Sequence, residues 1–261
     1  MRYLRLWRRF LVNALVREAE YRASFALAAL EGLSQVLLVV LAFELIYQFS
    51  DAIAGWRREQ ILLLIGVYRI ADGVVSTQIA PNMLALPGYV RTGELDFHLL
   101  RPVSSQFLVS TRRLTLPEAT NVLIGLGLIA YAAGPAGVVW DLLAIARALV
   151  LLLCGLVLLY AVWFAIMTCS VWLVTIDTLD TLFFSLFQAA RYPVQFFSGA
   201  ARALFTFAFP VAFATTFPTE ALLGRGDTRL VPLAVLLAGA ALVGTHLFWR
   251  RALRRYESAS S

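Results

Sequence analysis

The sequence contains no lysine, because all 22 of its basic residues are arginine. A Walker A loop, GxxxxGK[ST], needs its lysine to contact the phosphates of a bound nucleotide. The chain therefore has no P-loop of its own. Cysteine and histidine are also scarce, with two of each. Cys154 and Cys169 lie in apolar runs without a CxxC motif, and His98 and His246 are far apart in the sequence. These four residues predict inert thiols and no metal site.

Charged residues make up only 15% of the chain, whereas 61% is hydrophobic and the mean hydropathy is +0.79. A soluble domain of 261 residues could not bury so much apolar surface, so lipid must solvate much of it. The net charge of +6 comes from arginines that bracket apolar runs. This placement indicates membrane boundaries and argues against a nucleic-acid partner.

Apolar runs of about 20 residues can cross ~30 Å of hydrocarbon as helices. Six such spans are predicted, so the fold class is an all-α membrane protein with one transmembrane domain over residues 1–261. The spans are 24–49, 59–80, 116–133, 141–173, 179–197 and 231–249. The third opens with a capping box at Thr115 and Glu118. Residues 198–223 are apolar but broken by Pro210 and Pro218, which predicts short re-entrant helices.

The arginines also predict the orientation, because cytoplasmic loops are enriched in basic residues. Fourteen arginines lie in the N-terminal segment, the 81–115 loop and the C-terminal tail 250–261, against four in the loops of the opposite side. Both termini and the 81–115 loop are therefore expected in the cytoplasm. The first 23 residues show no signal-peptide pattern and instead repeat apolar residues at helical spacing. They predict an amphipathic helix in the cytoplasmic interface, either a simple membrane anchor or a functional connecting element.

The second predicted span contains two charges, Arg69 and Asp72, three residues apart on one helix face. An ionisable residue at the bilayer centre costs roughly 2.5–3.5 kcal/mol on insertion scales. Two readings stay open at this stage. The pair is either a polar element on a translocation pathway or a static ion pair that fixes the packing of the bundle.

The segment PGYVRTGELDFHLLRPVSSQF, from Pro87 to Phe107, is polar and punctuated by turns within the long cytoplasmic loop. Its centre predicts one short helix across the cytoplasmic face. The polar side chains are Thr92, Glu94, Asp96 and His98, and the expected anchors are Leu95, Phe97, Leu99 and Leu100. Its exposed acids and aromatics would suit docking into a groove of another protein.

Four stretches together resemble the permease subunits of ABC-2 type transporters. They are RxADG in the second span, the Pro87–Phe107 segment, RYPVQFF, and FPVAFATTFP. The similarity covers nearly the whole chain and is closest to the six-span bacterial branch with an RTGELDxxLLRP segment. The resemblance implies an exporter subunit in the bacterial inner membrane, with two permeases paired above two copies of a P-loop ATPase. It also implies a second, different permease as the partner, hence a heterodimer.

By resemblance, the cytoplasmic segment acts as a coupling helix that enters a cleft of the ATPase. That role carries over to Tyr89, Val90, Arg91, Thr92, Gly93, Glu94, Leu95 and Asp96. The N-terminal helix would be the connecting helix along the membrane surface. ATP and Mg²⁺ would be bound by the ATPase, so this chain is expected to hold no cofactor.

Three other classes of function compete with this interpretation. An ion-coupled secondary transporter would use Arg69 and Asp72, but the second half of the chain holds no matching pair. A membrane enzyme is disfavoured because HExxH and GxSxG are absent, and Asp177 and Asp180 are explained as acids at a helix N-terminus. A scaffold that mainly transmits force, while the partner permease lines the path, is not distinguished by the sequence.

Overall fold

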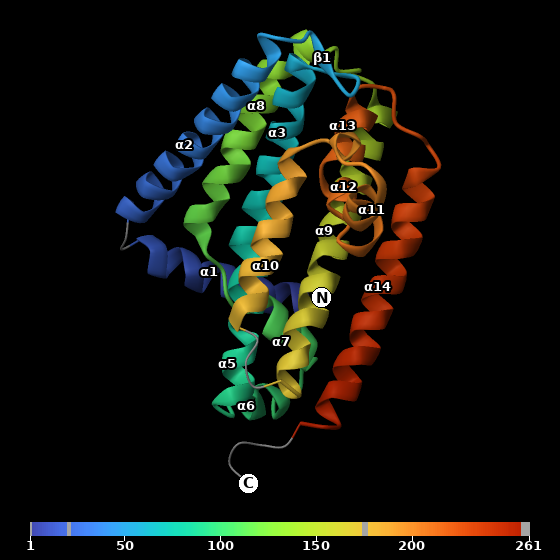
Figure 1. Ribbon diagram of the computed structural model, residues 1–261. Coiled ribbons are helices and arrows are strands. Elements are labelled where there is room, and N and C mark those ends of the chain that lie inside the picture. Colours follow the sequence, from blue (N-terminus) through green and yellow to red (C-terminus); the bar gives the residue numbers. More distant parts are fainter. Residues whose placement is uncertain (1, 20–21, 174–176, 257–261) are drawn as a thin grey trace.

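The computed structural model describes residues 2–19, 22–173 and 177–256, and its secondary structure is almost entirely helical (Figure 1). In the described part of the chain, one two-stranded hairpin joins the helix that ends at Tyr47 to the helix that begins at Arg58. The α-helices and strands are α1 (Arg2–Ala19), α2 (Arg22–Tyr47), β1 (Ala52–Ile53), β2 (Trp56–Arg57), α3 (Arg58–Val74), α4 (Ala80–Met83), α5 (Leu86–Arg91), α6 (Leu95–Leu99), α7 (Ser105–Thr111), α8 (Thr120–Ala136), α9 (Leu142–Thr168), α10 (Asp177–Phe187), α11 (Gly199–Ala203), α12 (Val211–Ala214), α13 (Thr216–Leu222) and α14 (Leu230–Leu253). Short 3₁₀ and π turns connect them, namely η1 (Val75–Ile79), η2 (Leu116–Ala119), η3 (Cys169–Val171), η4 (Gln188–Arg191), η5 (Val194–Phe196) and η6 (Leu204–Ala208).

Among the described residues, five helical stretches are long and apolar enough to cross a membrane. They are Ala23–Tyr47, Arg58–Arg91, Leu116–Ala136, Leu142–Val171 and Leu230–Leu253. A sixth span results if the bent pair Gly199–Ala208 and Val211–Leu222 counts as one. The prediction of an all-α membrane protein is therefore confirmed.

The second span is longer than its predicted range of 59–80, because the helical run continues to Arg91. Pro81 would break a regular α-helix, since it has no N–H to donate to the carbonyl of Thr77. Here the chain passes through the π turn η1 just before Pro81, and the Thr77 carbonyl accepts a hydrogen bond from the Thr115 amide at 3.0 Å. The helical run therefore continues past Pro81 and ends at Arg91, at the lower end of the bundle.

Helices α3 and α8 pack closely because glycines face each other. A Cβ on Gly125 would lie only 2.6 Å from the carbonyl oxygen of Gly66. Small residues let two helix backbones approach in a membrane, where dispersion contacts have to replace the hydrophobic effect between helices.

The fifth predicted span, 179–197, is not a single helix. Helix α10 has 11 residues, or ~17 Å of rise, and the chain continues as the 3₁₀ turns η4 and η5. Aromatic residues of α10 pack laterally against α9. The Phe183 ring stacks on Trp163 of α9 at a centroid distance of 3.9 Å. The predicted re-entrant range 198–223 coincides with the pair that bends by 63° around Pro210.

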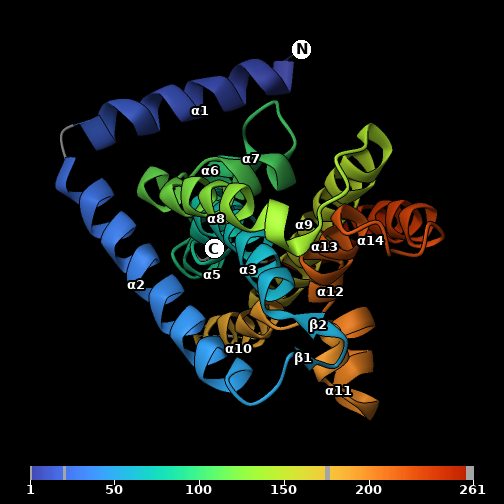
Figure 2. The same cartoon turned by 90° about the horizontal axis from the view of Figure 1, so that it is seen from above.

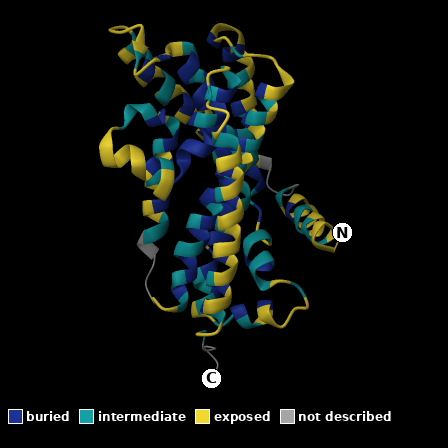
Figure 3. Ribbon diagram, turned by 90° about the vertical axis from the view of Figure 1, so that its right-hand side faces the viewer, coloured by how far each residue is buried: buried dark blue, intermediate teal, exposed yellow. Residues whose placement is uncertain are grey.

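Seen from above, α1 and α2 form an outer wall along two sides of the bundle, and α14 lies on the opposite side (Figure 2). Buried residues gather between the inner helices, while α14 and α1 expose much of their length (Figure 3). The predicted amphipathic helix 1–23 corresponds to α1. Its Phe10, Leu11 and Ala14 pack against Leu114 and Leu116, which lie just before and within η2.

Candidate functional site

The segment that was expected to couple to the ATPase forms two short helices instead of the single predicted one. Helix α5 ends at Arg91, and Gly93 then adopts a φ of +75° before α6 starts. This left-handed conformation costs glycine little but strains other residues, so glycine fits the corner between the two helices. The corner places α6 across the lower end of the molecule, beside α5 and α7 (Figure 1).

One face of the segment is anchored in the protein. Leu95 is fully buried, and it belongs to the same apolar cluster as Trp163 and Phe164 of α9. The buried Tyr89 hydroxyl accepts a hydrogen bond from Nε of Arg113 at 2.9 Å, and its ring lies 4.7 Å from the ring of His98. The inner face of the segment therefore packs into the hydrophobic core that extends along α9.

The opposite face of α6 is apolar and exposed. Phe97 is 67% exposed and Leu100 is 81% exposed. The expectation that Phe97, Leu99 and Leu100 anchor the segment is wrong, whereas His98, one of its polar side chains, is buried. The helical period places Leu95 and His98 on the inner face, and Phe97 and Leu100, also three apart, on the outer face. Exposed apolar side chains grouped at one site mark an interaction surface.

Arg112, Glu94 and His98 form a polar cluster next to the exposed apolar face of α6. Nη1 of Arg112 lies 3.7 Å from Oε1 of Glu94 and donates to Nε2 of His98 at 3.3 Å. Burial lowers the pKa of His98, and the neighbouring guanidiniums of Arg112 and Arg101 lower it further. Neutral His98 can therefore accept the hydrogen bond from Arg112 near pH 7.

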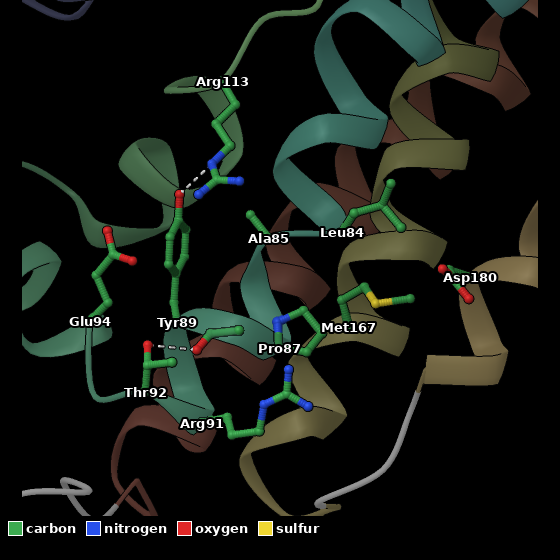
Figure 4. Close-up of a pocket in the computed structure, with 11 residues that line it drawn as sticks. Leu84, Ala85, Pro87, Tyr89, Arg91, Thr92, Glu94, Arg113, Met167 and Asp180 are labelled. Atoms are coloured by element: carbon green, nitrogen blue, oxygen red, sulfur yellow. Dashed lines mark hydrogen bonds between the residues drawn. The ribbon is translucent and has the colours of Figure 1, made fainter.

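A cavity of about 310 Å³, which we call the coupling cavity, opens beside the segment (Figure 4). Its lining includes Pro87, Arg91 and Thr92 of the segment together with Met167 and Asp180. In Figure 4 Arg91 reaches toward Pro87 and Met167, whereas Thr92 bonds back to the Gly88 carbonyl at 2.9 Å. The cavity thus lies between part of the segment and the ends of α9 and α10 that carry Met167 and Asp180.

The intramembrane charges are paired, as their spacing predicts. Nη1 of Arg69 lies 3.0 Å from Oδ2 of Asp72, and Arg69 is 3% exposed. Nη2 of Arg69 also donates to the Gly32 carbonyl at 2.8 Å and to Gln35 at 3.1 Å. One guanidinium therefore fastens α2 to α3, although α2 otherwise exposes a series of leucines.

A second cavity, of about 230 Å³, lies beside this pair between α2, α3, α8 and α10. Asp72 lines it together with Glu31, Glu118, Asn121 and Arg191. Arg69 therefore links α2 to α3, and its partner Asp72 lines a polar cavity.

The comparison with protein families now bears on this arrangement. The family model described as "ABC-2 family transporter protein" matches residues 33–260. The chain belongs to the ABC-2 transporter family. The comparisons with curated proteins and with solved structures found no match.

As an ABC-2 permease, the chain is a multi-pass membrane subunit for transport and is not itself catalytic. Family membership implies association with an ABC ATPase. This agrees with the absence of lysine, and hence of a P-loop, from the permease.

The structure brings the predicted residues of this permease into two separate groups. Tyr89 to Asp96 lie together at the lower end of the bundle, whereas Arg69 and Asp72 lie within α3. Sequence reasoning missed the outer residues Phe97 and Leu100 as a surface. Their i, i+3 spacing, matched by Leu95 and His98, was the signal that could have separated the two faces.

The depressed pKa of His98 predicts an acid-sensitive permease fold. Unfolding restores the ordinary histidine pKa of about 6.5, so below that pH the unfolded chain binds the proton more readily than the native one. The melting temperature of the wild type should therefore fall as the pH drops from 7 to 5. His98→Gln keeps an acceptor for Arg112, and its melting temperature should fall less. His246→Gln, at the exposed histidine, is the control, and an acid sensitivity equal in all three proteins would contradict the prediction.

Proposed function

We propose that this permease couples ATP hydrolysis in a separate ATPase to transport through the segment from Tyr89 to Leu100. The observation that supports this most is the exposed apolar face of α6, Phe97 and Leu100, at the end of the bundle away from the hairpin. An apolar surface outside the spans has to meet another protein to be buried. The adjacent Arg91, Thr92, Glu94 and Asp96 supply polar groups for the rim of such an interface.

The proposed orientation puts α5, α6, α7 and the end of α14 in the cytoplasm of a bacterial cell, with the hairpin on the other side of the inner membrane. The arginine distribution supports it, because Arg250 and Arg251 lie in the last turn of α14 and Arg254 and Arg255 follow it, at the same end as α6. The termini are then both cytoplasmic, and the ATPase can reach α6 directly.

The contacts of the segment suggest how force would pass upward. Val90 and Leu95 pack in the cluster that contains Trp163 of α9, Phe183 of α10 and Trp249 of α14. The same cluster includes Phe209 and Val211 at the bend of the broken pair. A tilt of α6 driven by closure of the ATPase would therefore bias several helices together, as a two-state element requires.

The partners in this proposal follow the family resemblance. Two copies of the P-loop ATPase would bind ATP and Mg²⁺, and a second, different permease would complete the translocation pathway as a heterodimer. The direction would be export. Arg69 and Asp72 would border that pathway while holding α2 in place.

An ion-coupled secondary transporter is the alternative. The contacts of Arg69 weigh against it, since three acceptors already surround its guanidinium. A coupling site has to release its ion, whereas a saturated ion pair favours a fixed packing role.

Gentle affinity purification of the tagged permease from its native membrane, followed by mass spectrometry, tests the proposal. We expect a P-loop ATPase and a second, distinct permease in the eluate. Recovery of the chain alone, together with ion-driven flux in liposomes that lack any ATPase, would overturn the proposal in favour of secondary transport.

A further inference from the structure

A larger cavity, about 580 Å³, adjoins the coupling cavity and shares Tyr89, Glu94 and Arg113 with it. Its walls come from the end of α1, from the region between α4 and α5, and from the chain that connects α7 to η2. We call it the arginine cavity and define it by Arg17, Arg112, Arg113, Glu94 and Thr115. It is distinct from the exposed α6 surface to which the coupling role is assigned.

The charges around the arginine cavity are unbalanced. Three guanidiniums line it against one carboxylate, Glu94, which lies 3.7 Å from Arg112, and just outside the lining Glu18 lies 3.8 Å from Arg17. A guanidinium has five N–H donors. Within the described part of the chain, Arg17 donates one to the Leu114 carbonyl at 3.0 Å and Arg113 donates one to Tyr89 at 2.9 Å. Most of the donors are therefore left for an anion that presents several oxygens, as a phosphate does.

The cavity lies at the level of the membrane surface. Helix α1, which carries Arg17, crosses the bundle at a steep angle to the spans (Figure 1). It exposes Leu4, Val12, Leu15 and Val16, and such a strip on a basic amphipathic helix buries itself at the boundary between headgroups and acyl chains. Phospholipid phosphates lie at that same boundary.

We propose that the arginine cavity binds the phosphate of an anionic phospholipid. The headgroup bridges Arg17 of α1 to Arg112 and Arg113, and it relieves the repulsion among the three cations. Arg112 also contacts Glu94 and His98 of the coupling segment. A lipid bound between Arg17 and Arg112 therefore holds α1 against that segment. This inference does not depend on which substrate the permease carries.

Native mass spectrometry of the full chain, released from nanodiscs of mixed phosphatidylglycerol and phosphatidylcholine, tests the site. Removing one arginine near a membrane surface weakens anionic lipid binding about fivefold. We expect the Arg17→Gln/Arg113→Gln variant to lose phosphatidylglycerol binding by on the order of 25-fold. The matched control is Arg5→Gln/Arg9→Gln, which removes the same charge from exposed positions of α1 outside the cavity and so measures the general attraction of the basic surface. The cavity variant should lose more phosphatidylglycerol binding than this control, and an equal loss in the two variants would overturn the site.

Arg113→Gln also removes the hydrogen bond to Tyr89, so the single variant Arg17→Gln provides a separate readout, with an expected loss of about fivefold. Equal phosphatidylglycerol retention in the wild type, the cavity variants and the control would overturn the site. Equal retention of phosphatidylcholine by the wild type would overturn the requirement for an anion. Displacement of the lipid by millimolar inorganic phosphate would show a site for free anions and would overturn the lipid assignment.

Discussion

Phe97→Asp combined with Leu100→Asp is expected to reduce recovery of the ATPase with the permease by on the order of 100-fold, as loss of an interface hot spot does. Both side chains are largely exposed, so the folded permease loses little packing. The loss falls on the complex, because two carboxylates would then have to be desolvated against an apolar groove. Co-purification of the ATPase, quantified against permease that inserts normally, measures the effect.

Two controls separate docking from folding. Phe49→Asp changes a residue that is 89% exposed at the hairpin end, and it should leave ATPase recovery unchanged. Leu95→Asp places a charge in the core and should destabilise the permease itself. Full ATPase recovery with the Phe97→Asp/Leu100→Asp variant would refute the assignment of α6 as the docking surface.

Arg69→Met is expected to destabilise the permease strongly, by about 3–5 kcal/mol as for other broken buried ion pairs. The substitution leaves Asp72 inside the bundle without its cation and removes the two hydrogen bonds that Arg69 donates to α2. Adding Asp72→Asn should restore part of this loss, because the uncompensated charge disappears. Unfolding of the single and double variants in detergent micelles, followed by tryptophan fluorescence, gives the coupling energy.

The ion pair between Arg58 and Glu44 provides a matched comparison. Its atoms are 2.6 Å apart, but the two side chains are 54% and 30% exposed. Exposed pairs contribute about 0–1 kcal/mol, so Arg58→Met should cost little. If the Arg69→Met/Asp72→Asn variant were as stable as the wild type yet inactive in transport, the fastening role would be wrong and an ion-coupling role would gain support.

Hydropathy was enough to find most of the spans, because an apolar run as long as that of α9 is stable in lipid and not in water. It failed at residues 179–197, where composition met the requirement but the chain turns at Gln188 and Pro193. Phe183 and Phe187 both lie in α10, where they pack against α9 and α3, and the helix ends directly after Phe187. Such tertiary contacts leave no periodic signal in the sequence.

The polar sites show the same limit. Contacts between residues close in the sequence could be predicted, whereas contacts between distant residues could not. The i, i+3 spacing of Arg69 and Asp72 predicted their ion pair, which the structure contains at 3.0 Å. Nothing in the sequence indicated that Gly32 and Gln35 would share the same guanidinium, because that depends on how α2 sits against α3. The support of the coupling segment by Arg112 and Arg113 was likewise hidden, since 14 to 24 residues separate them from His98 and Tyr89.

Site-specific photo-crosslinking tests the central claim most directly. A photoreactive phenylalanine analogue at position 97, in the complex purified from membranes, should give a covalent adduct with the ATPase when irradiated. The same analogue at position 49 should give none, because that residue lies at the opposite end of the bundle. Adducts from position 49, or none from position 97 while the complex remains intact, would contradict coupling through α6.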